Sequence, residues 1–356
     1  MKKDYLWFYI LPIFFSLIGL FFIFEASALR SFQEVGHSFF YVKRQIIWLI
    51  VAIFSMFFLS LFDYHRLYYL SFFLMVFTIF LLLIVLVPNF GSVAGGARRW
   101  LDLGFFNVQP TELAKFSTII YLSSWFIHKE RRRFWSFLFL LGILMFLIIL
   151  QPNLGTAILL FFLSIIIYYL AGVETYYLLF LIPASFGGFY FLMNLAPYRL
   201  KRLLAFLNPD MDPLGISYHL NQILISLSRG GFFGVGFSAS KQKYLFLPEA
   251  HTDSIFAIIA EEVGFLGCLI LIFSFCFFLI KIYQVMVRSR DRYGQLLAGG
   301  IFAFFNLQYF INLGGMVNLI PLTGTPLPFI SYGGSNLFVS FALVGVLVNI
   351  YRQAKK

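Results

Sequence analysis

The sequence predicts an all-α integral membrane protein with about ten transmembrane helices. Hydrophobic residues make up 61% of the chain and charged residues only 12%. Soluble domains carry about 45–50% apolar and about 25% charged residues. Apolar runs of roughly 18 or more residues recur, each long enough to cross about 30 Å of hydrocarbon at about 1.5 Å per residue. Because these runs are continuous and do not alternate, they indicate helices and not the strands of a β-barrel.

The runs are separated by short polar connections, so we expect one polytopic membrane domain over residues 1–356. The first run lacks a small-residue cleavage site and is too long for a signal peptide, which makes it the first span. The ten expected spans cover residues 6–25, 45–63, 67–87, 111–128, 134–150, 154–171, 175–194, 254–281, 297–317 and 335–352.

Positive charge sets the expected orientation. With both termini in the cytoplasm, the short inner connections hold 14 of the 26 Lys and Arg residues, as the positive-inside rule requires. The clusters at 129–133 and 288–292 are explained by topology and contact with anionic lipid. We therefore expect a multi-pass membrane protein with both termini in the cytoplasm, and the net charge of +11 needs no nucleic-acid partner.

Several basic residues fall on the expected outer side, where topology does not explain them. A polyanion bound outside the membrane would explain their presence. They are Arg98, Arg99, Arg199, Lys201, Arg202, Arg229, Lys241 and Lys243.

Most of them lie in the longest polar stretch, the extracytoplasmic loop 195–253 between spans seven and eight. Its residues 218–229 place apolar side chains at i, i+3, i+4 and i+7, which predicts an amphipathic helix at the membrane interface. Gly230 and Gly231 end that helix. The small residues around Gly234 and Gly236 indicate a backbone that a ligand could approach closely.

Asp253 closes this loop and opens the eighth span, which allows two interpretations. One is an N-cap aspartate, although Thr252 would cap as well. The other is a general base whose pKa is raised by partial burial. Glu249 and His251 add two titratable groups, an unusual density in a chain with so little charge.

Four charged residues lie within expected spans. Glu261 and Glu262 follow Asp253 in the same span, and either pair with a basic residue of another helix or mark a path through the membrane. Glu112 and Lys115 have the spacing and order of a helical ion pair. They either neutralise each other or hold a polar cavity.

Three outer loops rich in Gly and Pro, at 151–156, 321–328 and 330–335, complete the expected site. Irregular backbone near a membrane is tolerated where it is covered or lines a polar cavity. We therefore expect an outer cavity built from several loops, with Ser331 as a candidate binding residue. No zinc-type spacing, P-loop or Ser-His-Asp signature is present in the sequence.

Five motifs together resemble the SEDS family (shape, elongation, division and sporulation proteins of the FtsW, RodA and SpoVE type). They are Gly-Ala-Arg-Arg-Trp at 96–100, Gln-Pro-Thr-Glu-Leu-Ala-Lys at 109–115, Gln-Pro-Asn-Leu-Gly-Thr at 151–156, Leu-Pro-Glu-Ala-His-Thr-Asp at 247–253 and Pro-Leu-Pro-Phe-Ile-Ser-Tyr-Gly-Gly-Ser at 326–335. The resemblance implies a peptidoglycan glycosyltransferase that polymerises lipid II outside the cytoplasmic membrane. It implies that Asp253 is the essential residue.

Details of the motifs favour the FtsW branch, chiefly Ala250 and the preceding Gln242-Lys243. The sequence also departs from the family pattern. Asn153 stands where the family often has Asp, and Ser254 where Phe is usual; Gly96 and Ala239-Ser240 also differ. These departures put the placement of the acceptor sugar in doubt without removing the aspartate.

The mechanism that the resemblance implies uses lipid II as both donor and acceptor, with β-1,4 linkage by inversion and release of undecaprenyl pyrophosphate. Substrate binding would fall to Arg98, Arg99, Arg199, Lys201, Arg202, Lys243, Glu249, His251 and Ser331. A divalent cation, Mg²⁺ or Mn²⁺, would assist. Expected partners are a class B penicillin-binding protein, divisome or elongasome proteins and membrane lipid. The alternatives are a lipid II flippase and a non-catalytic scaffold for the penicillin-binding protein.

Overall fold

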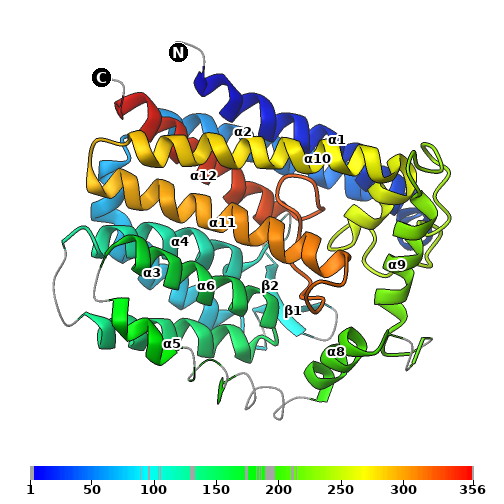
Figure 1. Cartoon of the computed structure of the whole chain (residues 1–356), viewed down its shortest axis with the longest axis horizontal. Helices are drawn as coiled ribbons and strands as arrows, with labels where there is room; N and C mark the ends of the chain where they lie inside the picture. The colour runs from blue at the N-terminus through cyan, green and yellow to red at the C-terminus, as the bar shows by residue number, and fades with distance from the viewer. Residues whose placement is uncertain are drawn as a thin grey trace.

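The computed structural model describes residues 4–88, 90–94, 97–102, 104, 106–128, 133–172, 175–181, 183, 185, 187–188, 197–209, 212–213 and 215–354. Of Asp4, Val93, Ala94, Thr175 and 197–199 it describes the backbone only. Long helices run side by side, and both chain ends lie at the same end of the bundle (Figure 1). This agrees with the expected placement of both termini on one side of the membrane.

The helices are α1 (Trp7–Val35), α2 (Phe40–Leu61), α3 (His65–Ile84), α4 (Pro110–Trp125), α5 (Phe134–Leu150), α6 (Leu154–Leu170), α8 (Pro197–Leu207), α9 (Tyr218–Gly230), α10 (Ile255–Arg288), α11 (Arg292–Met316) and α12 (Gly334–Ala354), with 3₁₀ turns at Asp4–Leu6 and Thr175–Tyr177. Among the described residues, six helices are long and apolar enough to cross a membrane: α1, α2, α3, α10, α11 and α12. Helices α5 and α6 are also apolar but shorter, with 17 residues each.

Nine of the ten expected spans coincide with described helices, whereas only 11 of the 20 residues of the seventh, 175–194, are described. The number of spans therefore stays a prediction. Helix ends follow local chemistry. Pro110 starts α4, where its missing N–H costs nothing. Asp291 caps α11 by accepting a hydrogen bond from the Gly294 N–H at 2.9 Å. Gly36, with φ of +80°, ends α1 in the left-handed conformation.

A small antiparallel sheet, absent from the expected all-α architecture, lies between α3 and α4. Its strands are β1 (Gly91–Ala94), β2 (Ala97–Asp102) and β3 (Asn107–Val108), in the order β1-β2-β3. Gly91 pairs with Leu101, and Leu101 in turn pairs with Val108. The sheet holds the segment 97–102 in place near the start of α6 (Figure 1).

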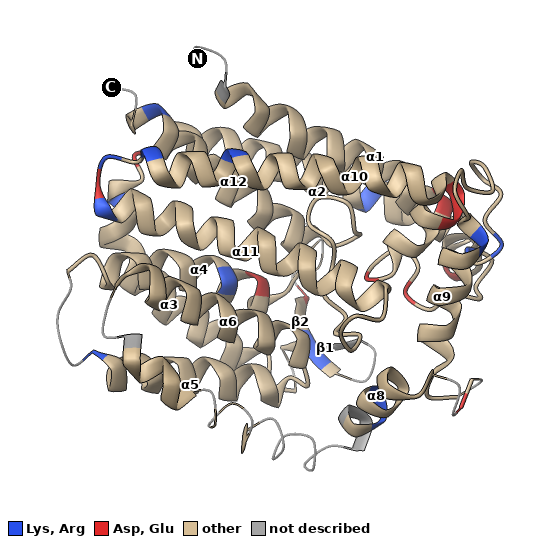
Figure 2. Ribbon diagram, viewed as in Figure 1, with Lys and Arg blue, Asp and Glu red and all other residues tan. Residues whose placement is uncertain are grey.

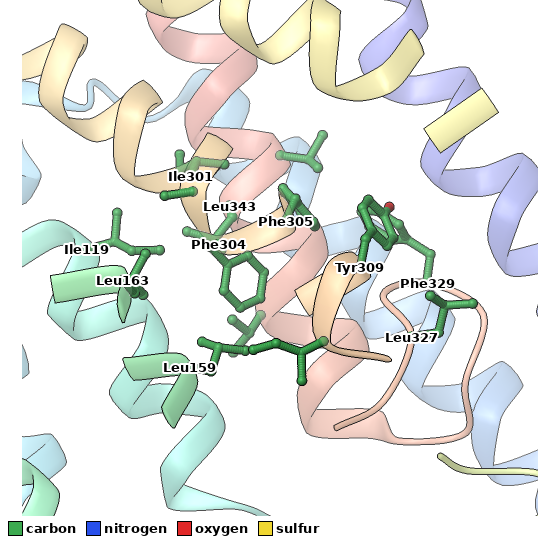
Figure 3. Packing of buried hydrophobic residues seen from close by; sticks show 14 of the residues in the cluster. Ile119, Leu159, Leu163, Ile301, Phe304, Phe305, Tyr309, Leu327, Phe329 and Leu343 are labelled. Carbon is green, nitrogen blue, oxygen red and sulfur yellow. The ribbon is translucent and has the colours of Figure 1, made fainter. Parts of the chain in front are cut away.

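Helix α12 is buried along almost its whole length and packs most extensively against α2. At the end near the termini, Asn349 Nδ2 donates to the Ser60 carbonyl at 3.0 Å, and the Tyr64 N–H donates to Asn349 Oδ1 at 3.0 Å. Aromatic rings of α11 and of the loop before α12, among them Phe305, Tyr309 and Phe329, form the centre of the core (Figure 3).

Charged side chains are concentrated at the two ends of the bundle. Lys and Arg gather at the ends of α10, α11 and α12 near the termini, and acidic and basic residues lie together at the opposite end, by α9 (Figure 2). At that opposite end, α9 and α8 lie across the ends of the long helices (Figure 1). The helix expected at 218–229 is confirmed as α9, and its place at the membrane interface stays a prediction.

Candidate active site

A cavity of about 520 Å³ opens among the start of α6, the second half of α11, the loop 320–324 and α8. It has one polar end and a long apolar wall. Its polar end is formed by Arg99, Asn153, Arg202, Asp253, Thr323 and Gly324, and its apolar wall by Leu154, Ile158, Phe162, Leu203, Leu307, Phe310, Ile311, Ile320 and Leu322. The loops at 151–156 and 321–328, which the sequence assigned to such a cavity, both line it.

Asp253 lies at the polar end, just before α10. Its carbonyl accepts a hydrogen bond from Asn312 Nδ2 at 2.9 Å, and the same nitrogen donates to the Thr325 carbonyl at 2.7 Å. Asn312 thus ties the backbone of Asp253 to the loop that closes the cavity. Gly324, in the left-handed conformation with φ of +72°, lies beside the carboxylate, so that a Cβ there would stand 3.0 Å from Asp253 Oδ2.

The alternative role of Asp253 as a helix cap is wrong. The N-cap of α10 is Ser254, and no side-chain hydrogen bond caps the helix. Thr252 uses its hydroxyl to donate to Glu249 Oε2 at 2.9 Å instead. Within the ranges given above, no hydrogen bond or ion pair to the Asp253 carboxylate is found, so its oxygens face the cavity.

The surroundings of Asp253 change its acidity. Burial raises the pKa of Asp253 to about 7, the negative charge of Glu249 adds to the rise, and the guanidinium groups of Arg202 and Arg99 oppose it. A carboxylate with a pKa near 7 accepts a proton far more readily than an ordinary aspartate at neutral pH. The site therefore holds a group suited to general base catalysis.

Two of the candidate basic residues face the cavity. Arg99 on β2 donates from Nε to the Gln151 carbonyl at 3.0 Å and from Nη2 to the Pro152 carbonyl, which fixes it against the turn before α6. Arg202, exposed on α8, lines the cavity as well. Both guanidinium groups are close enough to act on Asp253 electrostatically. The polar end is therefore positively charged around a single carboxylate.

The first turn of α6 also faces this end. Asn153 is its N-cap and accepts a hydrogen bond from the Thr156 N–H at 3.3 Å. Since Asn caps a helix as well as Asp does, the departure from the family pattern preserves the cap and removes a negative charge from the cavity. Gly155 lies so close to the Thr323 carbonyl that a Cβ would overlap it.

None of the other outward candidates whose side chains are described lines the cavity. Arg98 neighbours Arg99 on β2, and adjacent strand residues point to opposite faces. Lys201 is exposed on α8, and the side chain of Arg199 is outside the described residues. Glu249 is exposed and acts on Asp253 only through its charge.

His251 and Ser331 are buried and have structural contacts. His251 packs against the rings of Tyr41 and Tyr332, which also contact each other, and its carbonyl accepts a hydrogen bond from the Tyr332 N–H at 2.9 Å. Burial lowers the pKa of His251 to about 4, so it is neutral at pH 7. Ser331 Oγ accepts a hydrogen bond from the Leu327 N–H at 2.8 Å and stabilises the turn before α12.

The charged residues inside the bundle form ion pairs. Lys115 Nζ lies 2.7 Å from Glu112 Oε1, with both side chains buried. Glu261 accepts a hydrogen bond from Ser240 Oγ at 2.5 Å and pairs with Arg229 of α9. Lys243 pairs with Glu262 at 3.2 Å and with Glu25 of α1. None of the four intramembrane candidates lines the cavity that holds Asp253.

The small residues around Gly234 and Gly236 were expected to form a backbone that a ligand could approach closely, and this stays a prediction. At Gly234 the close neighbour is α10, because a Cβ there would overlap the Glu262 carbonyl. A Cβ on Gly236 would meet no atom within 4 Å.

Sequence reasoning missed four residues that shape the site. Gly324 and Asn312 position the carboxylate, and Gly155 allows α6 to approach the cavity loop. His219 of α9 makes a 2.7 Å hydrogen bond through Nε2 with Ser254 Oγ, directly after Asp253. The only sequence signal for any of them was the Gly and Pro content of the loops, which identified segments and not individual residues.

Comparison with known proteins identifies the family. A model of cell cycle proteins of the FtsW, RodA and SpoVE type matches residues 5–356. Stage V sporulation protein E of Bacillus subtilis is 38% identical, over 95% of this chain and 94% of that protein. A probable peptidoglycan glycosyltransferase FtsW of Coxiella burnetii is 37% identical, over 94% of this chain and 92% of that protein.

Solved structures agree with these relatives. A chain from a peptidoglycan synthase complex, described for its coordination of polymerization and crosslinking, superposes with a TM-score of 0.77 at 26% identity and covers 98% of both chains. The rod shape determining protein RodA of Thermus thermophilus matches with a TM-score of 0.71 at 24% identity, over 98% and 97%. The chain therefore belongs to the FtsW/RodA/SpoVE family of cell cycle proteins.

Proposed function

We propose that this chain is a peptidoglycan glycosyltransferase of the cytoplasmic membrane that polymerises lipid II at the outer face. One observation carries the proposal. The Asp253 carboxylate, with its raised pKa and no partner among the described residues, lies in a cavity that joins a positively charged end to an apolar wall. A lipid-linked sugar pyrophosphate has the matching chemistry, with an anion next to a long hydrocarbon chain.

The apolar wall supports a lipid substrate. Ile158 and Phe162 lie one turn apart on α6, opposite Leu307, Phe310 and Ile311 of α11. Phe162 and Phe310 are about half exposed, at 47% and 53%. The wall thus continues from the cavity to the outside of the bundle, where a polyprenyl chain would pass into the bilayer.

In the proposed reaction, Asp253 takes the proton from the 4-hydroxyl of the acceptor sugar. The acceptor oxygen forms a bond to the anomeric carbon of the donor, and the bond from that carbon to the pyrophosphate oxygen breaks. The electron pair of that bond leaves with undecaprenyl pyrophosphate. Because the acceptor attacks from the face opposite the leaving group, the configuration at the anomeric carbon is inverted. Arg99 and Arg202 would neutralise the charge that develops on the leaving group. The positive end of the α6 dipole would add to this effect.

A divalent cation fits this site only together with the substrate. In the part of the chain that the structure describes, no group of three His, Cys, Asp or Glu side chains could hold a metal ion. Mg²⁺ is often bound through one or two carboxylates and the substrate phosphates, so Mg²⁺ or Mn²⁺ would arrive with the pyrophosphate. We expect no Mg²⁺ binding by the protein alone in calorimetry. With lipid II, chelation by EDTA should reduce polymerisation.

The decisive test is polymerisation of purified lipid II in detergent, with wild-type protein and Asp253→Asn. Asn keeps the shape of the side chain and cannot accept the proton, so the variant should fold, bind lipid II and make no glycan. Lys241→Met, an exposed change in the same outer loop, serves as a matched control and should polymerise normally. Polymer formed by Asp253→Asn would refute the assignment.

The same assay separates the alternative functions. A flippase needs a membrane to cross and makes no polymer in detergent, whereas a scaffold would tolerate loss of Asp253. The charged residues that suggested a transport path are paired with each other or with the outer loop. The match to a synthase complex supports a penicillin-binding transpeptidase as the partner. Running the assay with and without that partner would measure its effect.

A further inference from the structure

Helix α10 is interrupted at Gly264, whose φ of +70° and ψ of −172° are not helical. Residues 255–263, here called the short segment, therefore form a separate helix of about 13 Å at 1.5 Å per residue. The loop 231–236 fills the interruption. Its N–H groups at Val235 and Gly236 donate to the carbonyls of Glu261 and Glu262 at 2.9 and 3.1 Å. Phe265 and Leu266 continue the bonding by donating to carbonyls of the same loop.

The near end of the short segment begins directly after Asp253. There it is fixed by the hydrogen bond that Asn312 donates to the Asp253 carbonyl and by the hydrogen bond between His219 and Ser254. Its far end carries Glu261 and Glu262. Because a short helix is stiff along its axis, the position of the far end acts together with these near-end bonds to set where Asp253 stands in the cavity.

Lys243 fixes that far end. Its side chain is only 8% exposed and bonds Glu262 Oε1 at 3.2 Å while it pairs with Glu25 of α1. Ser238 Oγ holds the other Glu25 oxygen at 2.8 Å. One ammonium group thus joins α1, the outer loop and the short segment.

Net stability is a weak explanation for this cluster. Burying each ion costs several kcal/mol, and apolar replacements of similar volume are often as stable or more stable. Charged groups do, however, specify one geometry, because few arrangements satisfy all three of them.

We propose that Lys243 is a positioning residue for Asp253: it sets the far end of the short segment and thereby the place of the carboxylate. The inference rests on the proposed role of Asp253 as the general base. It also changes the role expected for Lys243 from its charge alone, which was to bind the polyanion.

The test compares lipid II polymerisation by four variants. Lys243→Met leaves two buried carboxylates without a counter-charge and is expected to lower the melting temperature. The triple variant Lys243→Met/Glu25→Gln/Glu262→Gln removes all three charges and should melt near the wild type. Lys243→Arg keeps the charge, and Lys241→Met is the exposed neighbour control.

We expect the triple variant to lose about 100-fold in kcat, as misplacement of about 1 Å can cost that much, with KM little changed. Lys243→Arg should recover most of the activity, and Lys241→Met should match the wild type. Amide hydrogen exchange should become faster at Val235 and Gly236 in the triple variant, because their acceptors are no longer held.

Three results separate the possible failures. A triple variant with wild-type kcat, beside an inactive Asp253→Asn, would overturn the positioning role and leave the proposed function intact. A rise in KM at constant kcat would overturn it in favour of substrate binding by Lys243. An active Asp253→Asn would refute the proposed function itself.

Discussion

Gly324 offers the most direct test of how closely the site is built around Asp253. In Gly324→Ala, the new Cβ would stand 3.0 Å from Asp253 Oδ2, which is shorter than an ordinary van der Waals contact. The carboxylate must therefore move by a few tenths of an ångström. The left-handed φ of +72° adds backbone strain of about 1–2 kcal/mol. The variant thus combines a general cost in stability with a local cost in geometry.

The control separates these two costs. Gly36 has a similar φ of +80°, and a Cβ there would meet no atom within 4 Å. Gly36→Ala should therefore lose the same about 1–2 kcal/mol of stability and keep full activity.

The assay is lipid II polymerisation at saturating substrate, with melting temperatures measured in parallel. A shift of a few tenths of an ångström should reduce kcat of Gly324→Ala about tenfold, given that about 1 Å can cost about 100-fold. If Gly324→Ala and Gly36→Ala have the same kcat, the carboxylate does not occupy a unique place, and the reasoning fails.

Three further predictions concern charge. The rate of polymerisation should rise with pH through about 7, as Asp253 loses its proton. Because the negative charge of Glu249 helps to raise the pKa of Asp253, Glu249→Gln should move this rise to lower pH in a pH–rate profile. An unchanged profile would exclude the coupling between Glu249 and Asp253. Lys115→Met should destabilise the protein by about 3–5 kcal/mol, since it leaves a buried carboxylate unpaired, and a second change, Glu112→Gln, should recover most of that loss in thermal unfolding; equal melting temperatures for the single and double variants would contradict the pairing. Burial lowers the pKa of His219 to about 4, below its unfolded value of about 6.5. The contribution of neutral His219 to stability is therefore present in full above pH 6.5 and is lost as the pH falls toward 4. His219→Gln should make the melting temperature fall less steeply between pH 6.5 and 4.

The membrane helices could be predicted because their signal is local. An apolar run long enough to cross the bilayer has few other uses, and nine of the ten expected spans coincide with described helices. The small sheet could not be predicted. Its longest strand, Ala97–Asp102, has six residues and carries Arg98 and Arg99, too short and too polar for a clear alternating pattern.

The site divides in the same way. Asp253 could be predicted because it stands in a dense local motif. The role of Lys243 could not, because its partner Glu25 lies 218 positions earlier in the chain. A count of the outward charges predicts the sign of the electrostatic field on the outer side. It does not predict which of the cations are paired with carboxylates in the folded chain. Gly324 contacts a residue 71 positions before it, and only the folded chain brings the two together.

The position of α12 has a consequence for how the protein is made. This helix lies at the centre of the bundle, yet it is synthesised about 270 residues after its main partner α2. At roughly 5–20 residues per second, about 15–50 s pass between the two. During that interval the part of α2 around Met56 and Leu59, which lies against Gly345 of α12, has no final partner. The helices that enter the bilayer first must therefore leave a gap for a late arrival, and contacts such as the hydrogen bond from Asn349 of α12 to the Ser60 carbonyl of α2 can form only after that gap has closed.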